Sequence, residues 1–149
     1  MRAAIDGNLI IAKLEDGEAL LGSLQKIVAD YWVDSGTVLW GIGMVREFEV
    51  GYFDGKEYRR RTFGPPHELL ALHGSITARG DPAFHIHLAA ADETHGVVGG
   101  HLFKATVSTL NEICIAQFRG IHLGRELNPR SGLRELVLES SRGEAGPST

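Results

Sequence analysis

Short apolar runs separated by polar or glycine-rich segments recur along the chain, and this pattern predicts a β-rich fold. The predicted strands cover residues 8–15, 37–45, 47–53, 56–60, 68–76, 84–88, 97–109, 112–118 and 133–138. Asp54-Gly55 lies between two of these strands and is expected to form a tight hairpin turn. Phe63-Gly64-Pro65-Pro66 is expected to be a loop, because proline cannot donate a hydrogen bond within a central strand.

One segment, residues 18–32, has helical periodicity instead. Its apolar residues recur every three to four positions and predict one stripe, made of Leu20, Leu21, Leu24, Ile27, Val28, Tyr31 and Trp32. A stripe of this width favours a helix that covers a sheet. Asp16 is expected to accept hydrogen bonds from the free amides of the helix start, and Glu18 to favour the same end of the helix dipole.

These elements predict an α+β domain, in which about seven or eight of the predicted strands form an antiparallel or mixed sheet that is packed by one main helix. Short hairpin connections favour this class over a doubly wound parallel sheet. With 149 residues, 43% of them hydrophobic, the chain is long enough for one sizeable core. A single domain is therefore expected over residues 1–139, followed by a disordered C-terminal tail at 140–149, which is small and polar.

Charge and cysteine content narrow the possible partners and the compartment. The net charge of −4 argues against a broad basic surface, so any DNA contact would use a local patch such as Arg59-Arg60-Arg61. An exposed strand edge is the alternative explanation of that run. The single cysteine, Cys114, cannot form an intrachain disulfide and fits a reducing cytoplasm. No apolar run is long enough for a membrane span, so a cytoplasmic protein is expected.

The candidate chemistry concentrates in residues 84–103, which contain three histidines. His85 and His87 alternate with apolar residues, so both rings should leave the same face of a strand. A polar turn follows, and the returning strand could bring His101 back towards the pair. Three neutral imidazoles suit Zn²⁺ or a similar divalent metal and leave a fourth coordination position for water. The alternative is that these are ordinary surface or hydrogen-bonded histidines.

Several motifs together resemble the PPC family, named for its conservation in plants and prokaryotes. They are Gly-Ile-Gly-Met-Val at 41–45, Gly-Tyr-Phe-Asp at 51–54, residues 68–74, and His85-x-His87-Leu with Gly99-Gly100-His101. The resemblance implies a sandwich-like fold, a homotrimer, and zinc held by His85, His87 and His101. It also implies a wider structural relation to acetolactate decarboxylase, an enzyme with zinc on three histidines. The Arg-Gly-Arg-Pro core of the AT-hook found in plant relatives is absent from the sequence.

Two classes of function remain open from the sequence, and the first is favoured over the second. The first is a trimeric zinc-containing module with a DNA-binding, regulatory or assembly role. The second is a zinc-dependent enzyme, such as a lyase, decarboxylase or hydrolase, that acts on a small carboxylate or carbonyl compound.

An enzyme would need acid and base groups near the metal, and the sequence offers only weak candidates. Glu68 and Glu112 are the candidate catalytic carboxylates, with structural ion pairing as the alternative for each. His73 and His95 are further candidates for proton transfer, and Arg59–Arg61 or Arg119 could anchor a substrate carboxylate. No role is assigned to His67 or His122 from the sequence.

Overall fold

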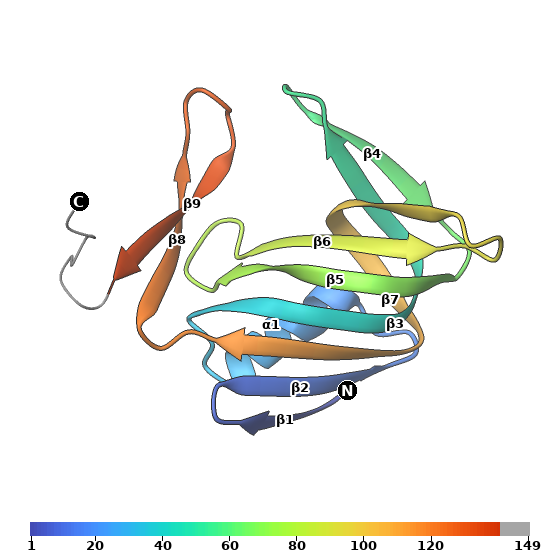
Figure 1. Ribbon diagram of the computed structural model, residues 1–149, viewed down its shortest axis with the longest axis horizontal. Helices are drawn as coiled ribbons and strands as arrows, with labels where there is room; N and C mark the ends of the chain where they lie inside the picture. Colours follow the sequence, from blue (N-terminus) through green and yellow to red (C-terminus); the bar gives the residue numbers. More distant parts are fainter. Residues whose placement is uncertain (141–149) are drawn as a thin grey trace, which may run out of the picture.

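The computed structural model describes residues 1–140 and contains one helix and nine strands within them (Figure 1). The elements are β1 (Arg2–Asp6), β2 (Leu9–Glu15), α1 (Leu20–Asp30), β3 (Ser35–Phe53), β4 (Tyr58–Phe63), β5 (His67–Thr77), β6 (Phe84–Ala91), β7 (Val97–Gln117), β8 (Ile121–Leu127) and β9 (Arg134–Ser140). Within the described residues, no helix is both long and apolar enough to cross a membrane.

Seven of the strands form one sheet in the order β1-β2-β7-β6-β5-β3-β4, and β7 also pairs with β3. Every pairing in this sheet is antiparallel. Because β3, β5, β6 and β7 pair in a closed cycle, the sheet curls around part of the core. The predicted α+β class, with a largely antiparallel sheet and one helix, is confirmed.

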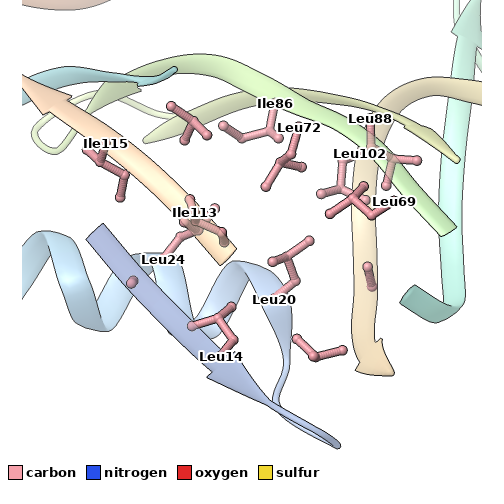
Figure 2. Packing of buried hydrophobic residues seen from close by; sticks show 14 of the residues in the cluster. Leu14, Leu20, Leu24, Leu69, Leu72, Ile86, Leu88, Leu102, Ile113 and Ile115 are labelled. Atoms are coloured by element: carbon pink, nitrogen blue, oxygen red, sulfur yellow. The ribbon is translucent and has the colours of Figure 1, made fainter. Parts of the chain in front are cut away.

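The helix lies against one side of this sheet, behind β3 in Figure 1. Its stripe supplies Leu20, Leu24, Ile27 and Val28 to the core, as expected from their spacing. Figure 2 shows Leu20 and Leu24 facing apolar side chains of β2 and β7, with those of β5 and β6 above them. The stripe ends earlier than predicted, because Trp32 follows the helix with a positive φ of 57° and is 86% exposed.

The expected helix cap at Asp16 is wrong. The N-cap residue is Ala19, which makes no side-chain cap hydrogen bond, and the first turn has no acidic residue. Asp16 instead accepts hydrogen bonds from the Arg46 guanidinium and from the backbone N–H of Thr109. It therefore ties the β2–α1 connection to β3 and β7 rather than starting the helix.

Two pairs of predicted strands are each one long strand. Residues 37–45 and 47–53 are both part of β3, and residues 97–109 and 112–117 are both part of β7. The β3–β7 register shifts at several points, among them Gly43/Val45 and Arg46/Glu49, where bulges bend the strands without ending them. The sequence pattern breaks at those irregularities, so it suggested two strands where the backbone continues.

The hairpin predicted at Asp54-Gly55 is confirmed, with Phe53 paired to Tyr58 and the Asp54 carboxylate accepting from the Lys56 N–H at 3.0 Å. Two strands, β1 and β8, were not predicted. β8 and β9 form a separate two-stranded sheet that stands beside the main sheet in Figure 1.

The predicted tail began at Ser140, which instead ends β9. The rest of the expected tail, 141–149, lies outside the described residues.

Candidate metal centre

The three histidines come from two neighbouring strands, β6 and β7. Ile86 and Leu88 alternate with them on β6 and are 1% and 3% exposed, so the opposite face of this strand enters the core. His87 is the direct cross-strand partner of His101. Alternation on β6 and register with β7 thus bring the three imidazoles to one place, the arrangement that the sequence suggested.

The ligand atoms of the three rings converge. Each ring offers one nitrogen, either Nδ1 or Nε2, and these three nitrogens lie within 4.8 Å of one another. The Nε2 atoms of His85 and His87 are 3.1 Å apart. Two nitrogens bound to one tetrahedral zinc ion at 2.0–2.1 Å lie about 3.3 Å apart. The spacing of His85 and His87 is close to this value, so these two nitrogens are spaced as ligands of one ion, and a nitrogen of His101 lies within 4.8 Å of them.

Two glycines allow the strands to approach each other at the histidines. Gly74 has φ 154°, and a Cβ there would overlap the backbone oxygen of His85. Gly100, next to His101, has φ 152°, and its Cβ would lie 2.6 Å from the backbone oxygen of Gly51. Both positions need the conformational range and the missing side chain of glycine. The glycines in the family-like motifs therefore set the backbone on which the ligands are held.

Aromatic side chains support His101. Its ring centroid lies 4.8 Å from the ring of Tyr58 and 4.8 Å from that of Phe103. The guanidinium of Arg60 covers Phe103 at 3.7 Å from the ring centre. The His101 ring is therefore held by packing, which reduces the entropy lost when it binds a ligand.

Burial and mutual proximity keep the three rings neutral. Burial, followed by the charges of His85, His87 and Arg60, lowers the pKa of His101 to about 4. Burial also lowers the pKa of His85, helped by His87 and Arg125, and the pKa of His87, helped by His73. Metal ions bind the neutral form of imidazole, so the electrostatics of the cluster favour the state that can coordinate.

The residues present fit a metal ion on two further grounds. The Nδ1 atom of His101 is buried and has no hydrogen-bond partner within the described part of the chain. A buried polar atom left in this way is costly unless a ligand binds it. Within residues 1–140, the side chains that cluster closely enough to share a metal ion are these three histidines, and no carboxylate or cysteine joins them. A metal held there would keep a coordination position free of protein.

A cavity of about 470 Å³ adjoins the cluster. His85 and His101 line it on one side, and the β8–β9 hairpin lines it on the other. A second, more open depression is formed by His73, Gly74, Ser75, His85 and His87. The histidines are therefore reachable from solvent.

The sequence profile of the Plants and Prokaryotes Conserved (PCC) domain, the family written PPC above, matches residues 1–119. The chain belongs to this family. The matched segment includes all of β1–β7 and therefore the three histidines, whereas β8 and β9 lie beyond it.

Solved structures with the same fold agree with this assignment. A metal-containing protein from Archaeoglobus fulgidus is 27% identical, with a TM-score of 0.79 over 88% of this chain and 94% of that one. A plant- and prokaryote-conserved protein from Pyrococcus horikoshii is 25% identical, with a TM-score of 0.77 over 90% and 94%. A proposed DNA-binding protein from Ralstonia eutropha JMP134 is 25% identical, with a TM-score of 0.81 over 92% and 96%.

Curated relatives of this PCC-domain chain are much longer. The bifunctional protein GlmU of Synechococcus sp. strain JA-3-3Ab is 28% identical over 91% of this chain and 21% of its own length. The same protein from strain JA-2-3B'a(2-13) is 26% identical over 89% and 20%. The chain thus spans about a fifth of the length of these relatives.

The two candidate catalytic carboxylates do not join the histidines in this PCC domain. Glu68 lies at the opposite end of β5, paired with Ala91, and Glu112 is on the far half of β7, paired with Lys13. Both are exposed, and neither lines a cavity beside the cluster. The geometry therefore gives no support to a catalytic role for either.

The remaining histidines differ in position. His73 is opposite His87 and exposed, so it borders the cluster. His67 is buried, with its Nδ1 2.9 Å from the carbonyl of Pro65. His95 lies in the turn before β7, and His122 pairs with Asp34 at 3.1 Å.

One residue of the cavity was missed by the sequence analysis. Arg125, on β8, lines the same cavity as His85 and His101. Of the expected anchors, Arg119 donates to the carbonyl of Gly7 and Arg59 pairs with Asp54 at the hairpin. Arg60 lies over Phe103, next to His101, but it does not line the cavity. Nothing in the local sequence marks Arg125, because only the packing of the C-terminal hairpin brings it to the histidines.

Proposed function

We propose that this PCC-domain protein holds a divalent metal ion, Zn²⁺ by its ligand chemistry, on His85, His87 and His101. The observation that carries the proposal is that three neutral imidazoles offer nitrogens within 4.8 Å of one another. Among the described residues, no fourth protein ligand joins this cluster. The relative from Archaeoglobus fulgidus, which is called metal-containing, supports it.

The role that the site supports best is a metal-dependent reaction on a small carboxylate or carbonyl compound. Zinc bound at three histidines supplies a Lewis acid that polarises a carbonyl or carboxylate oxygen. The residues of this chain hold the rings in place, keep them neutral, and provide an adjoining cavity large enough for a small molecule. A structural zinc site would instead use all four positions for protein ligands.

Metal content tests the proposal. Protein purified without added metal should contain about one zinc per chain, measured by plasma mass spectrometry. His87→Ala should lose at least about tenfold in metal affinity, because it removes one of three ligands. His122→Ala is the matched control, since this histidine pairs with Asp34 away from the cluster, and it should keep its metal. Equal metal content in His87→Ala and the wild type would contradict the assignment.

The second candidate is a DNA-binding or regulatory module. The description of the Ralstonia eutropha relative and the exposed Arg59–Arg61 run on the edge strand β4 favour it. Arg59 and Arg60 already pair with Asp54 and Glu49, which weakens the patch for phosphate binding. A duplex-DNA titration at low and high salt separates the candidates, because binding through phosphates would weaken steeply with salt. No binding at low salt would remove this candidate.

We also propose that the chain assembles as a homotrimer. The outer face of the sheet carries exposed apolar side chains from β2 and β3, the strands on either side of β7, including Ile11 (47% exposed), Trp40 (41%) and Ile42 (46%). Ile11 and Trp40 flank Cys114 in the register of β2, β7 and β3, so they form one continuous row. An apolar face of this kind is typical of a surface that another protein chain covers.

A further inference from the structure

We infer that Arg125, together with the metal proposed at His85, His87 and His101, binds a small organic carboxylate in the cavity beneath the β8–β9 hairpin. The inference rests on the proposed function and adds to it the class of ligand and the residue that anchors it. Arg125 lies outside the segment that matches the PCC family, so the anchor belongs to the C-terminal hairpin of this chain.

Arg125 is fixed beside the histidines. Its Nη2 donates to the hydroxyl of Ser75 at 2.6 Å, and Ser75 is the direct cross-strand partner of His85. The guanidinium and the rings of His85 and His101 line the same cavity. A ligand in this cavity can therefore contact Arg125 and the histidine cluster together.

The guanidinium retains a hydrogen-bond donor that no part of the described chain uses. Its Nε is buried and lacks a partner, and no Asp or Glu of the described chain forms an ion pair with Arg125. Arginine stays charged in proteins, and an unpaired, partly buried cation is costly. The donor fork of a guanidinium matches the two oxygens of a carboxylate.

The charged groups that line the cavity also favour the binding of an anion. Two arginines, Arg125 and Arg134, and one carboxylate, Glu135, line the cavity, so its side chains carry a net positive charge. Arg125 next to a divalent ion would concentrate positive charge at one end of the cavity. A negatively charged ligand between them would neutralise part of it.

The lining indicates which anion fits. Besides the charged groups, the cavity wall contains Tyr58, Pro82, Leu133 and Leu136. A short aliphatic body can bury apolar surface against these side chains, whereas inorganic phosphate cannot. The cavity volume of about 470 Å³ admits a molecule of several carbon atoms. These features favour an aliphatic carboxylate over a free phosphate.

Calorimetric titration of the zinc-loaded protein tests the inference. Butyrate is the probe, inorganic phosphate is the competing anion, and butyramide is the neutral analogue. Butyrate should bind more tightly than phosphate, and butyramide should bind at least about tenfold more weakly than butyrate. Arg125→Gln should weaken butyrate binding by at least about tenfold, because it removes a charge-assisted pair. Arg119→Gln removes a guanidinium that donates to the carbonyl of Gly7, and it should leave the affinity for butyrate unchanged.

Metal analysis of the same samples distinguishes the two ways to fail. If the wild type holds one zinc per chain and Arg125→Gln binds butyrate as tightly as the wild type does, this inference is overturned and the metal proposal stands. Tighter binding of phosphate than of butyrate would overturn the carboxylate class. A wild type without metal would overturn the proposed function and this inference with it. Should Arg125→Gln fail to fold by circular dichroism, Arg125→Lys retains the charge without the fork and should bind butyrate several-fold more weakly.

Discussion

At the scale of single residues, the site depends on side chains that are present and on side chains that are missing. The three histidines offer nitrogens, while Gly74 and Gly100 let the strands that carry them come close together. The alternation around His85 and His87 was enough to predict that both rings share a face. The contribution of Arg125 could not be predicted, because it depends on a hairpin that packs back from the end of the chain.

Gly74→Ala should destabilise the protein and disturb the cluster. The positive φ alone costs about 1–3 kcal/mol for a residue other than glycine, and the new Cβ would meet the backbone of His85. Gly64→Ala is the control, since its Cβ would meet nothing within 4 Å. Urea denaturation should show a lower free energy of unfolding for Gly74→Ala and almost no change for Gly64→Ala. Equal stability of the two variants would contradict the role given to Gly74.

At the scale of elements, periodicity predicted the helix and most strands but misplaced several of their ends. The helix begins at Leu20 because its apolar stripe packs on the sheet, without the side-chain cap that Asp16 was expected to provide. β3 and β7 continue through bulges that interrupt the alternation, so they looked like separate strands. β1 is a short, mostly exposed edge strand, and its pattern is too weak to predict on its own.

Leu24→Ala should test the packing of the helix on the sheet. Leu24 is completely buried, and removal of its side chain should lower the free energy of unfolding by about 2–5 kcal/mol through lost burial and a cavity. Gln25→Ala changes the next, exposed residue and should alter stability by less than about 0.5 kcal/mol. Thermal and denaturant unfolding measure both. A small effect at Leu24 would mean that the helix contributes little to the core.

At the scale of the whole molecule, the curled sheet has the helix against it and the histidine cluster at another point of the same sheet. Its outer face between β2 and β3 is apolar and exposed in the single chain. The sequence motifs predicted the family correctly, and through it the fold. Hydropathy alone could not separate this outer face from the core, because both faces of these strands carry large apolar residues.

Trp40→Asp should dissociate the proposed trimer. A carboxylate in the apolar row formed with Ile11 and Cys114 would be buried without a partner on assembly. Trp32→Asp is the control, because Trp32 is 86% exposed and lies at the end of the helix. Light scattering coupled to size exclusion should give the mass of three chains for the wild type and the control, and one chain for Trp40→Asp. A monomeric wild type would contradict the trimer.

The central claim is that three imidazoles hold one metal ion whose remaining position is free of protein. X-ray absorption spectroscopy at the zinc edge of the purified protein tests it most directly. The account predicts about three imidazole nitrogens at roughly 2.0 Å, with one further oxygen ligand that is not from the chain. A shell with a sulfur ligand, a shell of four imidazoles, or a protein that contains no metal would contradict it.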